Sequence, residues 1–282
     1  MAPTAARLDP LAVRRELRAA GLRPQPARSQ NFLADPDVLE AILDLAAPAP
    51  GDRVLEIGPG LGILTGGLLD SGAIVTAIEL DAGLAALLRR RFAARIDARS
   101  LTLIEGDALD QALTAIVPPP YDVIANLPYH VTSPTLHRLL ESPPRPRRLV
   151  LMLQAEVADR IAAAPGRMSY LSVFVQYHAT VRVALRVPPE AFEPAPKVES
   201  AVVVIEPRTA TPLSTEREAD LWRLVQAGFR ERRKMLRNVL PRQMPHLGEH
   251  LDQALGAAGL DGERRPQTLS VAEWIALLEA LG

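Results

Sequence analysis

Short apolar runs alternate with longer amphipathic segments through the middle of this chain. The runs have the length of buried strands, and each segment between them repeats its apolar residues at helical spacing. The predicted strands cover residues 53–57, 74–79, 101–105, 121–125 and 149–154, and the predicted helices cover residues 61–70, 82–92, 133–140 and 155–163. Because strands that alternate with helices form parallel sheets covered by those helices, this pattern predicts an α/β fold.

The last two apolar runs, residues 180–187 and 200–205, depart from this alternation. The proline-rich link between them, residues 188–199, has no helical pattern. A parallel connection usually needs a crossover of about a dozen residues or more. We therefore expect an antiparallel pair, in a sheet that is mostly parallel and ends in one reversed strand.

Helical patterns flank this region on both sides. Asp9-Pro10 begins a helix that Gly21 can end, residues 23–29 are extended, and Asp35-Pro36 begins a helix that runs to residue 45. After Pro207 a stretch rich in Thr, Pro and Ser predicts a linker. The helices predicted beyond it cover residues 216–229, 232–240, 250–258 and 271–281, the last capped by Ser270. We predict two domains, residues 1–207 and residues 208–282.

Composition narrows the class of protein. The chain has 282 residues and no cysteine, which excludes disulfides and cysteine metal sites. No metal-ligand spacing links His130, His137 and His178, and we expect no metal. We see no apolar signal-peptide core and no run near the ~18 apolar residues of a membrane span. We expect a cytoplasmic protein, away from membranes, and a monomer.

The net charge is only -1, but the cations are clustered. Residues 229–237 carry five cations and one acid, and the N-terminal segment carries Arg14, Arg15, Arg18, Arg23 and Arg28. A chain that is neutral in total can still present a basic face to a nucleic acid. The candidate RNA-binding residues are Arg230, Arg232, Arg233, Lys234 and Arg237. The alternative is that these are ordinary solvated helix faces.

A glycine-rich turn follows the first predicted strand of the sheet. Gly58 and Gly60 stand where a strand turns into a helix, and glycine lets the backbone approach a ligand closely. The full dinucleotide fingerprint requires Gly or Ala where this chain has Ile63, and no Lys-Ser/Thr pair follows, which excludes a P-loop. Gly58 and Gly60 are therefore candidate contacts to a ligand without a pyrophosphate.

Acidic residues end the next two predicted strands. Glu79 follows the first glycine by about 20 residues, the position of an acid that binds ribose hydroxyls. Asp107 is placed to accept from the exocyclic amine of a bound adenine. With the glycine turn, these acids predict S-adenosylmethionine as cofactor. The alternative is that both acids only cap the following helices.

The fourth predicted strand ends in Asn126-Leu127-Pro128-Tyr129. The amine of adenine is a poor nucleophile, because its lone pair is delocalised into the ring. The Asn126 side-chain oxygen and the backbone carbonyl of Leu127 or Pro128 can accept from its two N–H groups and free the lone pair. Proline fixes the turn, and Tyr129 offers a ring for stacking, typically worth ~1–3 kcal/mol per base. Transfer is then an in-line displacement that needs mainly positioning, and we assign no general base.

These motifs occur together with three further segments, Gln30-Asn31-Phe32-Leu33, residues 187–202 and residues 229–234. In order and spacing, over nearly the whole chain, they resemble the ribosomal RNA small-subunit adenine N6,N6-dimethyltransferase family (KsgA, also called RsmA). The resemblance implies a Rossmann-like class I methyltransferase sheet with a small C-terminal helical domain. It implies dimethylation of adjacent adenines near the 3′ end of small-subunit (16S) rRNA, in ribosome biogenesis.

The resemblance also implies roles for three more residues. Asn31 and Leu33 would line the cofactor and close over its methionine end. Phe192 would stack the flipped adenine from the face opposite Tyr129, since enzymes that modify a base take it out of its stack. The alternative for Phe192 is core packing.

Other functions remain open at this point. One is a large-subunit rRNA adenine methyltransferase, and another is a ribosome-assembly factor that acts mainly by binding RNA. A DNA adenine methyltransferase is a further alternative, although the chain has no evident sequence-reading domain beyond its small helical appendix.

Overall fold

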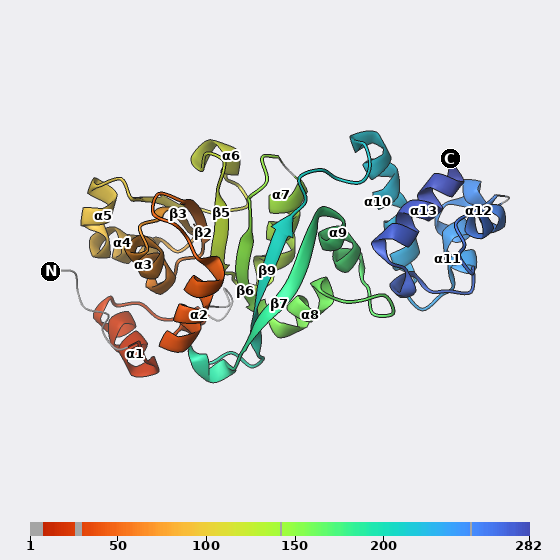
Figure 1. The fold of residues 1–282 in the computed structure, drawn as a ribbon. Helices are drawn as coiled ribbons and strands as arrows, with labels where there is room; N and C mark the ends of the chain where they lie inside the picture. Colours follow the sequence, from red (N-terminus) through yellow and green to blue (C-terminus); the bar gives the residue numbers. More distant parts are fainter. Residues whose placement is uncertain (1–7, 26–29, 142, 249) are drawn as a thin grey trace. The chain divides into compact units, whose positions relative to one another are not determined.

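The computed structural model describes residues 8–25, 30–141, 143–248 and 250–282. Arg28 and most of the extended segment 23–29 lie outside these ranges. The chain divides into two compact units (Figure 1). The first contains residues up to Ala158 together with Arg182–Pro207, and the second contains Asp159–Val181 and Arg208–Gly282.

A seven-stranded sheet forms the centre of the first unit, in the order β4-β3-β2-β5-β6-β9-β7. Its strands are β2 (Arg53–Ile57), β3 (Ile74–Glu79), β4 (Leu101–Glu105), β5 (Asp122–Asn126), β6 (Leu149–Gln154), β7 (Ala179–Val187) and β9 (Ser200–Pro207). The pairs from β4 to β6 are parallel, and β9 runs antiparallel to β6. The mostly parallel sheet with one reversed strand is therefore confirmed. The reversed strand does not end the sheet, however, because β9 lies between β6 and β7.

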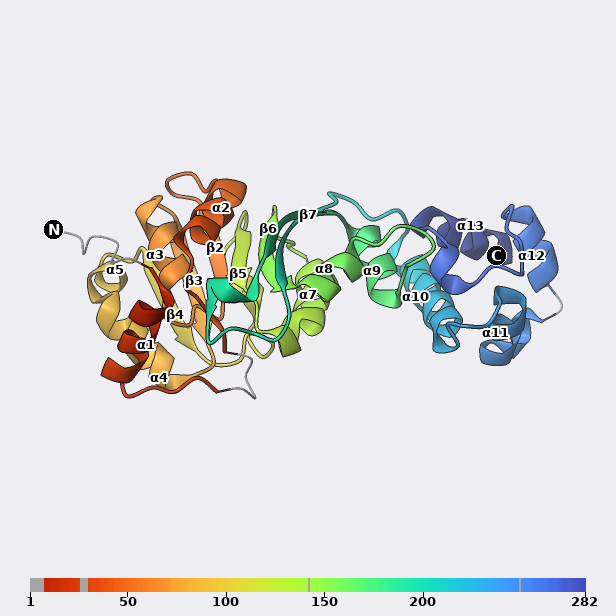
Figure 2. The same cartoon turned by 90° about the horizontal axis from the view of Figure 1, so that it is seen from below.

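Helices cover the sheet, as Figure 2, a view from below, also shows. They are α2 (Pro36–Ala46), α3 (Ile63–Asp70), α4 (Ala82–Arg91), α5 (Ala93–Asp97), α6 (Leu113–Ile116), α7 (Thr132–Glu141) and α8 (Ala155–Ile161), with α1 (Pro10–Ala19) before them. Aspartates begin three of them: the side chains of Asp9, Asp35 and Asp81 accept from the first-turn backbone of α1, α2 and α4. One core cluster joins apolar residues of α2 and α3 to alternate residues of the strands.

The order of the strands indicates where a ligand crevice lies. The chain runs outward through β2, β3 and β4, and then returns to add β5 on the other side of β2. Open α/β sheets bind ligands at such a switch point, outside the carboxyl ends of the strands. The glycine turn after β2 and the Asn126 segment at the end of β5 therefore meet at one edge.

A second, two-stranded sheet lies beside this edge. β1 (Phe32–Leu33) pairs antiparallel with β8 (Phe192–Glu193), so that Leu33 lies opposite Phe192. A short 3₁₀ turn, η3 (Pro189–Ala191), precedes β8, and the Ala34 N–H donates to the Ala191 carbonyl at 2.7 Å. The segment before α2 is thereby joined to the link between β7 and β9.

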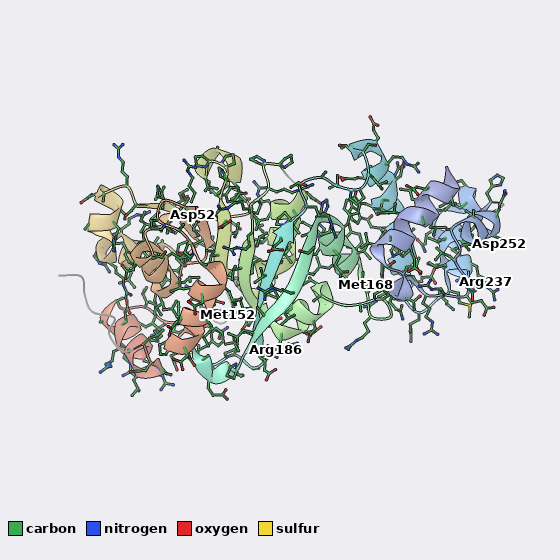
Figure 3. The ribbon with its side chains drawn as sticks, in the orientation of Figure 1. Asp52, Met152, Met168, Arg186, Arg237 and Asp252 are labelled. Atoms are coloured by element: carbon green, nitrogen blue, oxygen red, sulfur yellow. The ribbon has the colours of Figure 1, made fainter. Side chains whose placement is uncertain are left out.

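The second unit is helical, with its own core. Its helices are α9 (Tyr170–His178), α10 (Thr215–Arg230), α11 (Leu236–Gln243), α12 (Leu251–Ala257) and α13 (Val271–Leu281). Residues 159–181, which the sequence analysis places in the first domain, belong here because Tyr177 of α9 packs in one cluster with Leu221 of α10 and Trp274 of α13. Figure 3 shows the side chains of both units, with Met152 in the first and Met168 in the second.

Candidate active site

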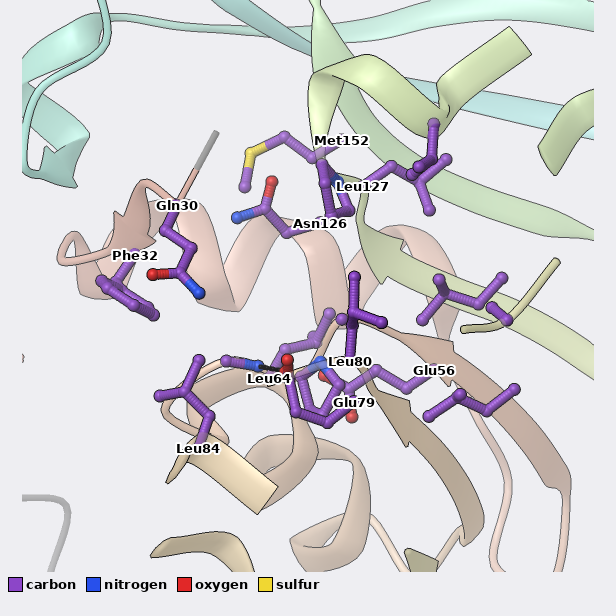
Figure 4. Close-up of a pocket in the computed structure, with 18 of the residues that line it drawn as sticks. Gln30, Phe32, Glu56, Leu64, Glu79, Leu80, Leu84, Asn126, Leu127 and Met152 are labelled. Atoms are coloured by element: carbon purple, nitrogen blue, oxygen red, sulfur yellow. Dashed lines mark hydrogen bonds between the residues drawn. The ribbon is translucent and has the colours of Figure 1, made fainter. Parts of the chain in front are cut away.

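One pocket opens at the carboxyl ends of the parallel strands (Figure 4). Its walls come from the turns after β2, β3, β4 and β5, together with residues 30–33. Every residue predicted to bind the cofactor lines it, namely Asn31, Leu33, Gly58, Gly60, Glu79, Asp107 and Asn126. Leu127, Pro128 and Tyr129 line the same pocket, so the structure brings the two predicted sites together.

The glycine turn depends on its glycines. Gly58 and Gly60 both have positive φ, 71° and 58°, a conformation that side chains disfavour. A Cβ on Gly58 would lie 3.3 Å from Cδ of Pro128, and one on Gly60 would lie 3.1 Å from the Phe32 ring. The turn is thus packed tightly between Pro128 and β1.

Glu79 is held by the backbone around it. Its carboxylate accepts from the N–H of Gly60 at 3.0 Å and from the N–H of Asp81 at 2.8 Å, and the residue is only 5% exposed. Burial raises the pKa of Glu79, and the backbone donors oppose this effect. Asp81, rather than Glu79, caps α4. Glu79 therefore ties the glycine turn to the end of β3, at the position where a ribose-binding acid is needed.

Asp107 makes a local turn contact. One of its carboxylate oxygens, Oδ1, accepts from the N–H of Leu109 at 2.8 Å. No helix begins there, so this contact closes a turn and Asp107 caps no helix. The residue lines the pocket beside Ala108 and Leu109.

Asn126 is the last residue of β5, and a hydrogen bond orients its side-chain carboxamide. Its Nδ2 donates to the backbone carbonyl of Asn31 at 3.4 Å, and no described residue donates to its Oδ1. The Pro128 carbonyl already accepts from the N–H of Val131 at 3.1 Å, whereas none of the described residues donates to the Leu127 carbonyl. Of the two backbone acceptors that the sequence leaves open, Leu127 is therefore the available one.

Tyr129 follows at the start of a short 3₁₀ helix, η2 (Tyr129–Val131). Its hydroxyl lies 2.8 Å from Oγ of Ser200, and its ring is half-buried at the pocket. Burial raises the pKa of the Tyr129 phenol, and the hydrogen bond with Ser200 partly lowers it. The ring therefore stays neutral and is held at its far end.

Phe192 is not among the residues that line the pocket. It is 2% exposed and packs in the core of the first unit with Leu33 and Ile42. Its place in the core fits the core-packing alternative, and stacking against the adenine stays a prediction. Its neighbour in register, Leu33, is the residue that reaches the pocket.

Glu56 is a pocket residue to which the sequence analysis gives no role. It is 1% exposed and accepts from the Thr65 hydroxyl at 2.6 Å, and burial raises its pKa to about 8. An acid inside the otherwise apolar run 54–57 was the available signal. Glu56, Glu79 and Asp107 line the pocket, and its described lining contains no Lys, Arg or His. With a pKa of about 8 Glu56 is protonated at pH 7 and adds no charge, but a lining without cations suits a positively charged ligand better than a pyrophosphate.

The basic cluster of the second unit is exposed. Arg232, Arg233 and Lys234 lie on a turn between α10 and α11. Helix α11 begins at Leu236, whereas the sequence analysis predicts a helix from residue 232. Within the described chain, no ion pair or hydrogen bond engages these three side chains. Arg230 donates to Gln243 at 3.0 Å, and Arg237 pairs with Glu263 at 2.9 Å. Arg237 is labelled in Figure 3.

Among the described residues, no helix is both long enough and apolar enough to cross a membrane. In the same ranges, no three His, Asp or Glu side chains gather as metal ligands.

Known proteins resemble this chain over most of its length. The family model described as "Ribosomal RNA adenine dimethylase" matches residues 23–279. A ribosomal RNA small subunit methyltransferase A from Moorella thermoacetica is 40% identical over 277 residues, covering 94% of this chain and 95% of the relative. The protein of the same name from Anaeromyxobacter dehalogenans strain 2CP-C is 45% identical over 274 residues, covering 93% and 94%.

Solved structures agree with this assignment. The 23S rRNA methyltransferase ErmE superposes with a TM-score of 0.72 at 27% identity, covering 89% of this chain and 99% of ErmE. A dimethyladenosine transferase from Plasmodium falciparum superposes with a TM-score of 0.72 at 25% identity, covering 87% and 95%. Since the family model spans both units and the relatives are 40–45% identical over nearly the full length, the chain belongs to the ribosomal RNA adenine dimethylase family.

Proposed function

We propose that this protein transfers methyl groups from S-adenosylmethionine to the N6 amine of adjacent adenines near the 3′ end of 16S rRNA, twice on each adenine. The observation that carries the proposal is an acid-lined pocket beside two acceptors, Asn126 Oδ1 and the Leu127 carbonyl, to which no described residue donates. The family and the names of the relatives support the same reaction.

The pocket residues fit the cofactor in charge and position. S-adenosylmethionine supplies an electrophilic methyl group on a positively charged sulfonium. Glu79 would accept from the ribose hydroxyls, Asp107 from the adenine amine, and the backbone of Gly58 and Gly60 would contact the ligand closely. Asn31 and Leu33 would cover the methionine end.

The catalytic segment acts on the incoming adenine. Asn126 Oδ1 and the Leu127 carbonyl would each accept one N–H of the amine, which draws the nitrogen toward a tetrahedral shape and frees its lone pair. The ring of Tyr129 would hold the base by stacking, worth about 1–3 kcal/mol. The residues present supply positioning and hydrogen-bond acceptors, and positioning is a large part of the barrier in a displacement of this kind.

The choice between ribosomal subunits depends on parts of the chain outside the pocket. Relatives with 40–45% identity are named for the small subunit, whereas ErmE, named for 23S rRNA, is 27% identical. We propose that Arg230, Arg232, Arg233, Lys234 and Arg237 bind small-subunit rRNA, because arginine suits phosphate contacts and three of these cations pair with no residue that the structure describes. A monomer acting in the cytoplasm during ribosome biogenesis completes the proposal.

The decisive experiment offers both ribosomal subunits, isolated from cells that lack the enzyme, with labelled S-adenosylmethionine. We expect label in the small subunit, and mass spectrometry of nuclease fragments should place dimethyladenine on adjacent adenines near the 16S 3′ end. Label confined to 23S rRNA would support the large-subunit alternative. Tight binding to immature small subunits without any methyl incorporation would support an assembly factor instead.

A further inference from the structure

The Tyr129 hydroxyl and the Ser200 hydroxyl form a hydrogen bond of 2.8 Å between residues 71 positions apart. Ser200 is 0% exposed, so the bond lies in the protein interior. The Tyr129 ring lies between this bond and the pocket that it lines. It is the only aromatic residue of the Asn126–Tyr129 segment.

The reversal of β9 brings Ser200 to this place. The parallel strands end at the pocket edge, whereas an antiparallel strand begins there. Ser200, the first residue of β9, pairs in register with Gln154, the last residue of β6, and Met152 of β6 pairs with Asn126. The serine thus stands one pleat beyond the catalytic asparagine along the shared strand.

We propose that Ser200 is a positioning residue for the adenine base, which acts by fixing the ring of Tyr129. This inference rests on the proposed function. A tyrosine ring is attached to the backbone at one end only, and a hydrogen bond at its hydroxyl restrains the other end. A restrained ring presents its face to an incoming base without losing side-chain freedom when the base arrives. No proton or electron is transferred in this role.

The contact can be tested without any substrate. Tyrosine labelled with ¹³C at Cζ gives signals for the four tyrosines, and Tyr129→Phe identifies the signal of Tyr129 by its loss. We expect Ser200→Ala to move this signal and to raise the pKa of the Tyr129 phenol, because the lost hydrogen bond lowers that pKa. A matched control is Ser172→Ala, which removes a hydroxyl that is also 0% exposed but bonds to the Arg160 carbonyl. It should leave the Tyr129 signal in place.

A double-mutant cycle tests the consequence for the base. With 16S rRNA in small subunits as substrate, Ser200→Ala should lower kcat/KM about three- to tenfold through a higher KM. This is the fold-change expected from the loss of one hydrogen bond. The affinity for S-adenosylhomocysteine should not change, and in the Tyr129→Phe background Ser200→Ala should have no further effect. An unmoved Tyr129 signal, or an equal loss in both backgrounds, would overturn the proposal. A wild-type protein that methylates no 16S rRNA would overturn the proposed function, while the Tyr129 signal still decides whether Ser200 holds the ring.

Discussion

The side chain of Asn126 donates a hydrogen bond of 3.4 Å to the backbone carbonyl of Asn31, 95 residues earlier in the chain. Both residues line the pocket. The contact uses the amide nitrogen of Asn126 and therefore turns its oxygen toward an incoming donor. The segment that we propose to cover the cofactor thus also orients the proposed acceptor of the adenine amine, which would link cofactor binding to base recognition through one side chain.

Asn126→Ala should reduce methyl transfer to small subunits by about two to three orders of magnitude, the usual loss when a positioned hydrogen-bonding group is removed from an active site. The fold should persist, because the side chain makes one long hydrogen bond and lines a pocket rather than the core. Incorporation of labelled methyl groups and thermal unfolding measure the two effects. Asn238→Ala, which changes an exposed asparagine of α11, is the matched control. Near-normal transfer by Asn126→Ala would refute the role of this residue.

Glu79→Ala should weaken binding of S-adenosylhomocysteine about 10- to 100-fold. The carboxylate is held by two backbone N–H groups, and hydrogen bonds to a charged group contribute about 1.5–3 kcal/mol each. Isothermal titration calorimetry measures the change. Glu105→Ala is the control, since Glu105 ends the neighbouring strand β4 but pairs with Arg89 at 2.9 Å outside the pocket. Equal affinities of the two variants would contradict the ribose-binding role.

The sequence predicts the sheet well because its strands are continuous apolar runs, and it predicts the pocket residues because they stand where those strands end. It cannot predict β1 and β8, which are two residues long and exist only because Leu33 pairs with Phe192. The same pairing explains why Phe192 faces the core. Helix α9 was missed for another reason: it is buried on nearly all sides, including Val173, Phe174 and Tyr177, so it lacks the polar face that gives a helical period.

Gly58→Ala should weaken both cofactor binding and methyl transfer. The substitution forces a side chain into a backbone with φ of 71° and places its Cβ 3.3 Å from the Pro128 ring, which belongs to the catalytic turn. A non-glycine residue in the left-handed region costs about 1–2 kcal/mol. Calorimetry and single-turnover assays should both show a loss. Gly256→Ala, at a helical glycine with open space around it, should bind cofactor like the wild type. An unaffected Gly58→Ala protein would mean that the turn does not need glycine here.

Stability should fall as the pH rises from about 5 to 8, and Glu56 should be one cause. Burial raises the pKa of Glu56 from 4.5 to about 8, so between these values the folded protein holds a proton that the unfolded chain has released. One such proton changes the free energy of unfolding by about 1.4 kcal/mol per pH unit. Burial also raises the pKa of Glu79, which adds to the slope in the same direction.

Glu56→Gln removes the Glu56 contribution while keeping the shape of the side chain. Urea unfolding at several pH values should therefore give a smaller slope for the variant than for the wild type, and the two proteins should approach each other in stability near pH 5. Parallel pH dependences of the two proteins would show that Glu56 is already ionised in the folded protein.

The turn between α10 and α11 should contribute to RNA affinity through charge rather than through shape. Replacing Arg232, Arg233 and Lys234 by alanine removes three exposed cations. The logarithm of the binding constant for small subunits falls linearly with the logarithm of the salt concentration, and each phosphate contact contributes ~0.7–0.9 to this slope. The variant's slope should therefore be smaller by about two to three. Affinity for S-adenosylhomocysteine should not change. Filter binding from 50 to 200 mM salt, roughly the range over which such contacts weaken, measures the slope.

The control replaces Arg53, Arg90 and Arg99, exposed arginines of the first unit, by alanine and alters net charge equally. If both triple variants lose the same slope, general charge and not this turn attracts the RNA.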